Sequence, residues 1–329
     1  MQPTSSAKST TYTASSATID RSDFQTTAGR FFTTGYCIAF GAAALIAAAE
    51  IKETGWAEFV RQWIIPPTSQ KELWEFFALA GSALLITAIS KGGFGGGVGI
   101  LSVPLMIYAT GSAKLVLGLW LPVLIVCDAT TIHRYPKEWS MRAVLRLTPG
   151  MILGITIVTI FLGKTNLDHP VDAKRLDDCL KLIVAAVSIV FLVLQLRPAR
   201  ASQNIAWQPS WLVSLPVGTI AGVTTMIAHA AGPIVVMFLL PQKLPKRVFM
   251  GTCGRFFFIF NTIKVPFMLA AGAMTLVSLR YGVWLMLLGP LGVWLGAWLN
   301  RRISPLWFVR LVQVSLFITA IKLVYDVLK

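Results

Sequence analysis

Charged residues are scarce in this chain. Only 13% of its 329 residues are Asp, Glu, Lys or Arg, against about 25% in an ordinary soluble domain. Apolar residues reach 55%, and a soluble chain of that composition could not cover its surface with polar groups. The composition therefore excludes a soluble globular enzyme, a disordered protein and a fibrous protein. It predicts a polytopic protein that crosses a lipid bilayer several times.

Acidic residues are the scarcer charged type, with 14 Asp and Glu against 29 Lys and Arg and a net charge of +15. In a soluble protein such an excess would suggest a nucleic-acid partner. Here the cations lie mainly in loops beside apolar segments, and no basic stripe with interleaved aromatic residues occurs. This pattern is typical of positive-inside topology and of anionic lipid headgroups. We therefore expect the lipid bilayer, and no nucleic acid, as a partner.

Patterns for metal binding and catalysis are also missing. The four cysteines and three histidines form no CxxC, HExxH or HxxxH pattern. No Ser/His/Asp or Cys/His arrangement is discernible, and no spanning segment carries two carboxylates at helical spacing. We therefore expect neither an enzyme nor a bound metal or cofactor.

Long apolar runs are what the chain has in abundance. Seven of them are uninterrupted and match the roughly 17–25 residues that a helix needs to cross hydrocarbon: 31–49, 113–132, 144–162, 180–196, 248–271, 281–299 and 308–328. Two more, 74–109 and 211–240, are interrupted by KGGFGGGVG and by TTMIAHAAGP. Two broken segments in matching positions indicate discontinuous helices at a transport site.

The two halves of the chain repeat in position. Asp128 follows Gly118 by ten residues, and Asn261 follows Gly251 by ten residues. Each interrupted run is followed by three spanning segments. Cations cluster in the loops near 8–30, 134–146, 197–200, 243–247 and 301–302. Placing all five clusters in the cytoplasm requires each interrupted run to return to its own side, so the repeats are inverted.

These observations predict an all-α polytopic membrane protein with two inverted repeats. Each repeat has a broken-helix hairpin and three spanning helices, and one extra spanning helix precedes them. The expected order is a disordered polar tail (1–29), a transmembrane helix with an external loop (30–72), repeat 1 (73–198), a cytoplasmic linker (199–209) and repeat 2 (210–329). The N-terminus is expected in the cytoplasm and the C-terminus outside.

Three charged residues inside apolar runs are candidate site residues. Lys91 precedes the first break, where it either binds an anion beside exposed backbone N–H groups or extends to the interface, since a cation near the bilayer centre costs about 2.5–3.5 kcal/mol. Arg255 suits bidentate binding of an oxyanion, or else pairs with Asp128. Asp128 is the one acid well inside a spanning segment, and it can carry a coupling proton, bind a cation, balance Arg255 or make a polar helix contact.

Uncharged candidates lie in or near the two breaks. The expected substrate-binding set, besides Lys91 and Arg255, comprises Gly95, Gly96, Gly97, Thr224, Thr225, His229 and Asn261. The glycines let a backbone approach a ligand, although close helix packing also favours them. His229 can donate to an oxyanion, or it is a structural residue. Lys264 lies towards the outer end of its helix and is expected to extend to the interface.

The residues GGFGGGVGILSVPLM, the later AGPIVVMFLL after a second break, and the duplicated halves resemble the sulfite exporter TauE/SafE family over about residues 73–329. The resemblance implies secondary transport of a small sulfur-containing anion, such as sulfite or an organosulfonate, across the bacterial cytoplasmic membrane. A proton or a sodium ion is the candidate coupling ion. The residues alone lead to an anion transporter. A passive anion channel, a transporter of a non-sulfur organic anion and a membrane-embedded enzyme are the alternatives, and homo-oligomerisation stays open.

Overall fold

A computed structural model describes most of both predicted repeats. The described residues are 64–66, 68–69, 71–97, 99, 102–162 and 208–302, with Lys52, Leu182 and Ala186. The predicted polar tail, the first span, nearly all of the span at 180–196, most of the linker and the last span lie outside the described residues.

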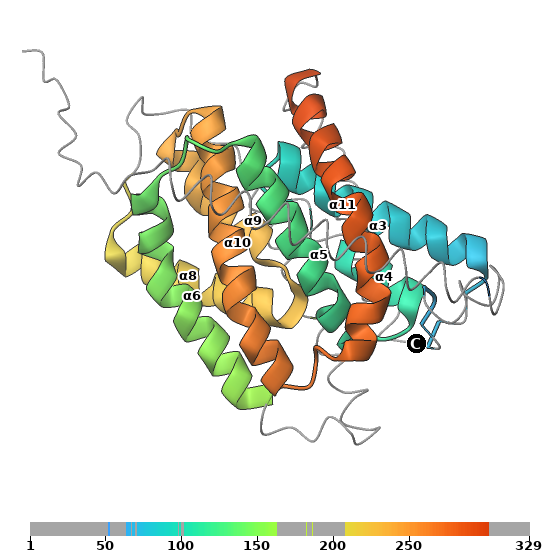
Figure 1. Ribbon diagram of the computed structural model, residues 1–329. Coiled ribbons are helices and arrows are strands. Elements are labelled where there is room, and N and C mark those ends of the chain that lie inside the picture. Colours follow the sequence, from blue (N-terminus) through green and yellow to red (C-terminus); the bar gives the residue numbers. More distant parts are fainter. Residues whose placement is uncertain are drawn as a thin grey trace, which may run out of the picture. The chain divides into compact units, whose positions relative to one another are not determined.

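Every regular element in the described ranges is helical (Figure 1). The elements are α3 (Leu73–Gly93), α4 (Ser102–Thr110), α5 (Ala113–Arg134), α6 (Met141–Leu162), α8 (Trp211–Ala228), α9 (Ala231–Leu239), the short 3₁₀ helix η2 (Leu240–Gln242), α10 (Lys246–Ala270) and α11 (Leu276–Arg302). Six of these helices are long and apolar enough to cross a membrane. The expected all-helical membrane protein is therefore confirmed for this part of the chain.

Both predicted breaks are present. The first long helix, α3, ends at Gly93, and the backbone turns through Gly95 and Gly96 at φ +67° and +82° before α4 begins. Glycine adopts this left-handed region without the steric cost that a Cβ brings. The second long helix, α8, ends at Ala228, and His229 caps it at φ +51° before the nine-residue helix α9.

The end of α3 is buried, so its last carbonyl groups need partners that water does not supply. The N–H of Phe94 donates to the carbonyl of Ser90 at 2.8 Å. The next three carbonyls face side-chain donors. Gly92 accepts from the Tyr135 hydroxyl at 3.2 Å and Gly93 from the Asn300 amide, while Lys91 lies 3.4 Å from the Thr131 hydroxyl, whose one hydrogen it shares with the carbonyl of Cys127 at 2.9 Å. A helix can therefore stop inside the protein without leaving its backbone unsatisfied.

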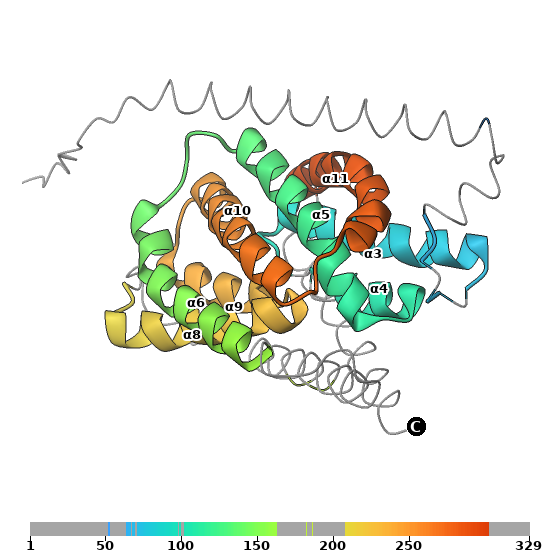
Figure 2. The same ribbon diagram turned by 60° about the horizontal axis from the view of Figure 1, so that its bottom comes forward.

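The two broken helices approach from opposite sides (Figure 2). In that view α3 begins at the right and α8 at the left, and each runs towards the middle, where α5 and α10 lie. α3 packs against α11, and α8 packs against α6, while α5 contacts both α10 and α11. The central helix α5 has the most buried span, and its Trp120 is fully buried.

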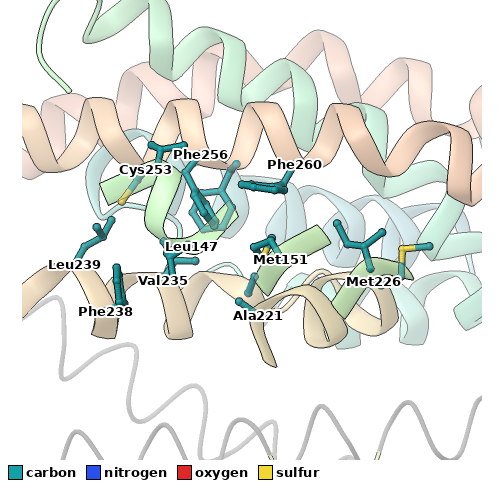
Figure 3. Close-up of a cluster of buried hydrophobic side chains, with 14 of the residues drawn as sticks. Leu147, Met151, Ala221, Met226, Val235, Phe238, Leu239, Cys253, Phe256 and Phe260 are labelled. Atoms are coloured by element: carbon teal, nitrogen blue, oxygen red, sulfur yellow. The ribbon is translucent and has the colours of Figure 1, made fainter. Parts of the chain in front are cut away.

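A large apolar cluster packs α6 of the first predicted repeat against α8, α9 and α10 of the second (Figure 3). Cys253, Phe256 and Phe260 project from α10 towards Val235 and Phe238 of α9. The rings of Phe256 and Phe260 are 4.7 Å apart between centroids, a separation at which aromatic pairs add to the burial term. Methionines of α6 and α8 fill the remaining space, since their unbranched side chains adapt to irregular gaps.

Helices α6 and α8 meet along glycines. Gly154 of α6 lies so close to α8 that a Cβ would overlap the carbonyl oxygen of Thr219 and stand 2.9 Å from the Cα of Gly222. Small residues permit such contacts between membrane helices, because no hydrophobic force acts between apolar helices in lipid and packing contributes the attraction. The glycines thus fix how deeply α8 inserts beside α6.

We predict opposite effects for one substitution at two glycines. Gly154→Ala should lower the melting temperature of the detergent-purified protein by at least about 3 °C, because overpacking costs about 1–3 kcal/mol. Gly81→Ala in α3 is the matched control, since a Cβ there meets nothing within 4 Å and alanine raises helix propensity. Equal melting temperatures for the two variants would contradict the close contact.

Candidate functional site

Buried polar side chains converge where the two breaks meet the central helices. α3 contributes Lys91, α5 contributes Asp128, and α10 contributes Asn261 and Lys264. The last turn of α8 contributes Thr225, and His229 follows at the end of this helix. Lys91 is 7% exposed, and Asp128 and Lys264 are fully buried. The cluster therefore holds ionised groups away from water.

Lys91 and Asp128 form a buried ion pair. The Lys91 ammonium lies 2.5 Å from Oδ1 of Asp128, and the Asn261 amide donates to Oδ2 at 2.7 Å. The alternative in which Lys91 extends to the interface is wrong, because its charge is met inside the protein. Pairing of Asp128 with Arg255 is also not observed. Lys91 and Asn261 reach this carboxylate instead.

Lys264 is part of the same cluster, contrary to the expectation that it extends to the interface. Its ammonium donates to the carbonyl and the hydroxyl oxygens of Thr225 at 3.2 and 3.0 Å, and lies 3.0 Å from Nδ1 of His229. One sequence signal points to it. The predicted repeat aligns Asp128 with Asn261, 133 residues later. The same offset aligns Thr131, one helical turn after Asp128, with Lys264.

The hydrogen bonds of His229 define its protonation. Nε2 lies 3.1 Å from the carbonyl oxygen of Leu117, and a carbonyl only accepts, so Nε2 carries the proton. Nδ1 then accepts from the Lys264 ammonium. The network fits a neutral imidazole beside a charged Lys264, whose three N–H groups meet three acceptors.

With Lys91 and Lys264 protonated and Asp128 ionised, the cluster carries a net charge of +1. The charged side chains that are buried in the described part of the chain are Lys91, Asp128 and Lys264. Asp128 balances Lys91, while Lys264 contacts neutral groups. A charge in a medium of low dielectric is costly without a counter-charge. The arrangement therefore favours an anion close to Lys264 and Lys91.

A small cavity adjoins this charge. It is lined by Thr87, Lys91, Gly96, Gly99, Val103, Trp120, Leu124, Thr225, His229, Gly232, Phe257 and Asn261. The space open to water centres is about 20 Å³, which is room for about one water molecule. Both breaks contribute to the wall and touch each other, since a Cβ on Gly232 would overlap the carbonyl oxygen of Gly96.

Five of the residues expected to bind substrate therefore line one cavity: Lys91, Gly96, Thr225, His229 and Asn261. Gly95 and Gly97 flank this wall, with Phe249 of α10 and Val236 of α9 against them. The hydroxyl of Thr224 donates to its own helix at the carbonyl of Ile220, at 2.9 Å. Thr224 is thus beside the cavity wall without contributing to it.

Arg255 lies apart from the cavity. Its guanidinium donates to the carbonyl oxygens of Tyr135 at 3.1 Å and Gly251 at 3.3 Å, and to that of Pro136. It also stacks 5.1 Å from the ring of Trp139. The side chain therefore ties α10 to the connection between α5 and α6. Among the described residues, no three His, Cys, Asp or Glu side chains gather as a metal site.

We predict that removing one member of the Lys91–Asp128 pair is more damaging than removing both. Asp128→Asn should lower the melting temperature by roughly 10 °C, because an unpaired buried charge costs about 3–5 kcal/mol. The double variant Lys91→Met with Asp128→Asn should recover most of that loss. Glu138→Gln is the control, since it breaks a solvent-exposed pair with Arg247 worth at most about 1 kcal/mol. Additive losses in the double variant would contradict the pair.

Comparison with known protein families identifies the family to which this chain belongs. The model of the family described as sulfite exporter TauE/SafE matches residues 79–323, which span both breaks and every residue of the cluster. No curated protein and no solved structure matches the chain. The chain therefore belongs to the sulfite exporter TauE/SafE family, whose members are membrane transporters of sulfite and related sulfur anions.

Proposed function

We propose that the protein is a secondary transporter that moves sulfite or an organosulfonate across the bacterial cytoplasmic membrane by alternating access. The anion is held in the cavity between the two breaks, whose walls move apart to admit it, since the cavity as observed has room for about one water molecule. The observation that carries this proposal is the excess buried positive charge of Lys91, Asp128 and Lys264 beside that cavity. A monovalent anion makes the cluster neutral, and Coulomb attraction is strong where water is excluded.

The short helices support anion binding in the same place. Gly232 lies in the first turn of α9 and Val103 in the first turn of α4, and both line the cavity. A helix N-terminus carries about half a positive charge and unpaired N–H groups. Two such ends at one cavity add to the field of the lysines, as in transporters whose broken helices hold anionic substrates.

We also propose that the two halves are inverted repeats related by a pseudo-two-fold axis. Matching contacts support it. Thr131 donates to the carbonyl of Lys91, and its counterpart Lys264 donates to the carbonyl of Thr225. Helix packing matches in the same way. The broken helix α3 of the first repeat packs on α11 of the second, and the broken helix α8 of the second repeat packs on α6 of the first. An axis of this kind passes near the hydrogen bond between Asp128 and Asn261.

Asp128 is the proposed coupling residue. Its carboxylate holds the Lys91 ammonium at 2.5 Å. Protonation of Asp128 would release Lys91 to the anion, and loss of the proton would draw Lys91 back. One side chain thus links the binding of an ion to the binding of the substrate, which is what coupled transport requires.

The first prediction of this proposal concerns flux. Proteoliposomes containing the full chain should accumulate sulfite against its gradient, and a protonophore or dissipation of sodium should abolish accumulation. Lys264→Met should reduce uptake at least about tenfold, since it removes the excess charge. Lys246→Met is the matched control, because that lysine is exposed and donates to the carbonyl of Asn300.

Two outcomes would support other functions. Flux that only dissipates the sulfite gradient would identify a passive anion channel. Acetate uptake equal to sulfite uptake would identify a transporter of non-sulfur organic anions. Unchanged sulfite uptake by Lys264→Met would move the site away from the cavity.

A further inference from the structure

We propose that the indole N–H of Trp120 and the hydroxyl of Thr87 are the hydrogen-bond donors that bind the oxygen atoms of the transported anion. This inference rests on the proposed function and deepens it, since it names the neutral half of the anion site. Neither residue carries a charge, and neither lies in a break.

Trp120 is a buried donor without an acceptor. Its side chain is fully buried in the middle of α5, and Nε1 has no hydrogen-bond partner among the described residues. An indole nitrogen can only donate, and buried tryptophans usually find a partner. Leaving such a donor unpaired costs stability. An N–H retained at this cost is explained when a ligand supplies the acceptor.

Thr87 shows the same feature in α3. It is 1% exposed, and its hydroxyl has no partner within the described ranges. Other helical threonines in the chain donate to the carbonyl four residues earlier, as Thr131 does to Cys127 at 2.9 Å and Thr252 does to Val248 at 2.6 Å. The hydroxyl of Thr87 does not make this bond. It is therefore available to another acceptor.

Both residues line the one cavity that adjoins the buried lysines. Thr87 and Lys91 are four residues apart on α3, so they share a face of that helix. On α5, Trp120, Leu124 and Asp128 follow each other at the same spacing. The two faces meet where Lys91 pairs with Asp128. The cavity thus combines one ammonium, two neutral donors and an apolar wall.

The donor set describes the ligand. Lys91, Trp120 and Thr87 can each donate one hydrogen bond to a separate oxygen, and the net charge of the cluster balances one negative charge. Val103, Leu124 and Phe257 form the apolar part of the lining. The ligand that matches is a monovalent oxyanion with three terminal oxygens on one atom. A carboxylate offers only two.

Isosteric variants test the assignment. Thr87→Val removes the hydroxyl and keeps the shape, and Trp120→Phe removes the N–H and keeps an aromatic ring. Binding of sodium hydrogen sulfite and of methanesulfonate, which are monovalent oxyanions with three oxygens on sulfur, to the purified full chain is measured by calorimetry, alongside the melting temperature without ligand. Each variant should raise Kd about tenfold, the loss expected for one hydrogen bond to a charged group.

The melting temperature separates a binding role from a structural one. Thr87→Val should melt at the same temperature as the parent protein or higher, because it removes an unpaired buried group. Thr262→Val and Trp294→Phe are the matched controls, since Thr262 bonds its own helix and Trp294 is exposed. Both should bind hydrogen sulfite like the parent protein.

Three results would overturn the assignment. If Thr87→Val and Trp120→Phe have unchanged Kd values while Lys91→Met binds more weakly, the proposed transport function is retained and these two donors do not bind the anion. A bound water would then be their partner. A lower melting temperature of Thr87→Val with unchanged Kd would make the hydroxyl structural. Absence of hydrogen sulfite and methanesulfonate binding by the parent protein would overturn the proposed substrate class and this assignment together.

Discussion

The cost of holding ionised side chains away from water governs this structure. Lys91, Asp128 and Lys264 lie within the membrane-spanning part of the protein, where each charge must find a partner. The partners come from four different helices and from the turn after α8. α5 can be the most buried helix because its one acid is matched by Lys91 and Asn261. The packing of the other helices around α5 encloses this cluster.

The interruptions of α3 and α8 serve the same constraint. A continuous helix satisfies its own backbone and presents only side chains, whereas a helix that stops exposes backbone groups. Here the freed carbonyls of α3 accept from Thr131, Tyr135 and Asn300. At the end of α8, the carbonyl of Thr225 accepts from the His229 N–H at 3.1 Å and also from Lys264. Glycines at Gly96 and Gly232 let the two breaks touch. Backbone that is irregular at this depth is tolerated because protein surrounds it.

Much of this arrangement could be predicted from sequence, because breaks and buried charges interrupt an otherwise apolar chain. Lys91, Asp128 and Asn261 were recognisable by their depth within apolar runs. Depth along a helix does not reveal which way a side chain points. Arg255 and Lys264 are nine residues apart on α10 and project from opposite faces, so only Lys264 shares the Asn261 face. No sequence pattern marks Trp120 and Thr87, because whether an N–H or a hydroxyl lacks a hydrogen-bond partner depends on the groups that surround it in the folded protein.

The single excess positive charge has an electrical consequence. With Asp128 ionised, the proposed site has a charge of +1 when empty and none when a monovalent anion occupies it, so the membrane potential acts on the empty site alone; with Asp128 protonated, the loaded site keeps a charge of +1. Moving one elementary charge through the whole field corresponds to about 2.3 kcal/mol per 100 mV. A negative interior would draw the empty site inward and leave the loaded passage unopposed. The voltage of a respiring cell would therefore bias the cycle towards expulsion of the anion when the anion crosses without a proton on Asp128, and a proton that crosses with the anion would remove this bias.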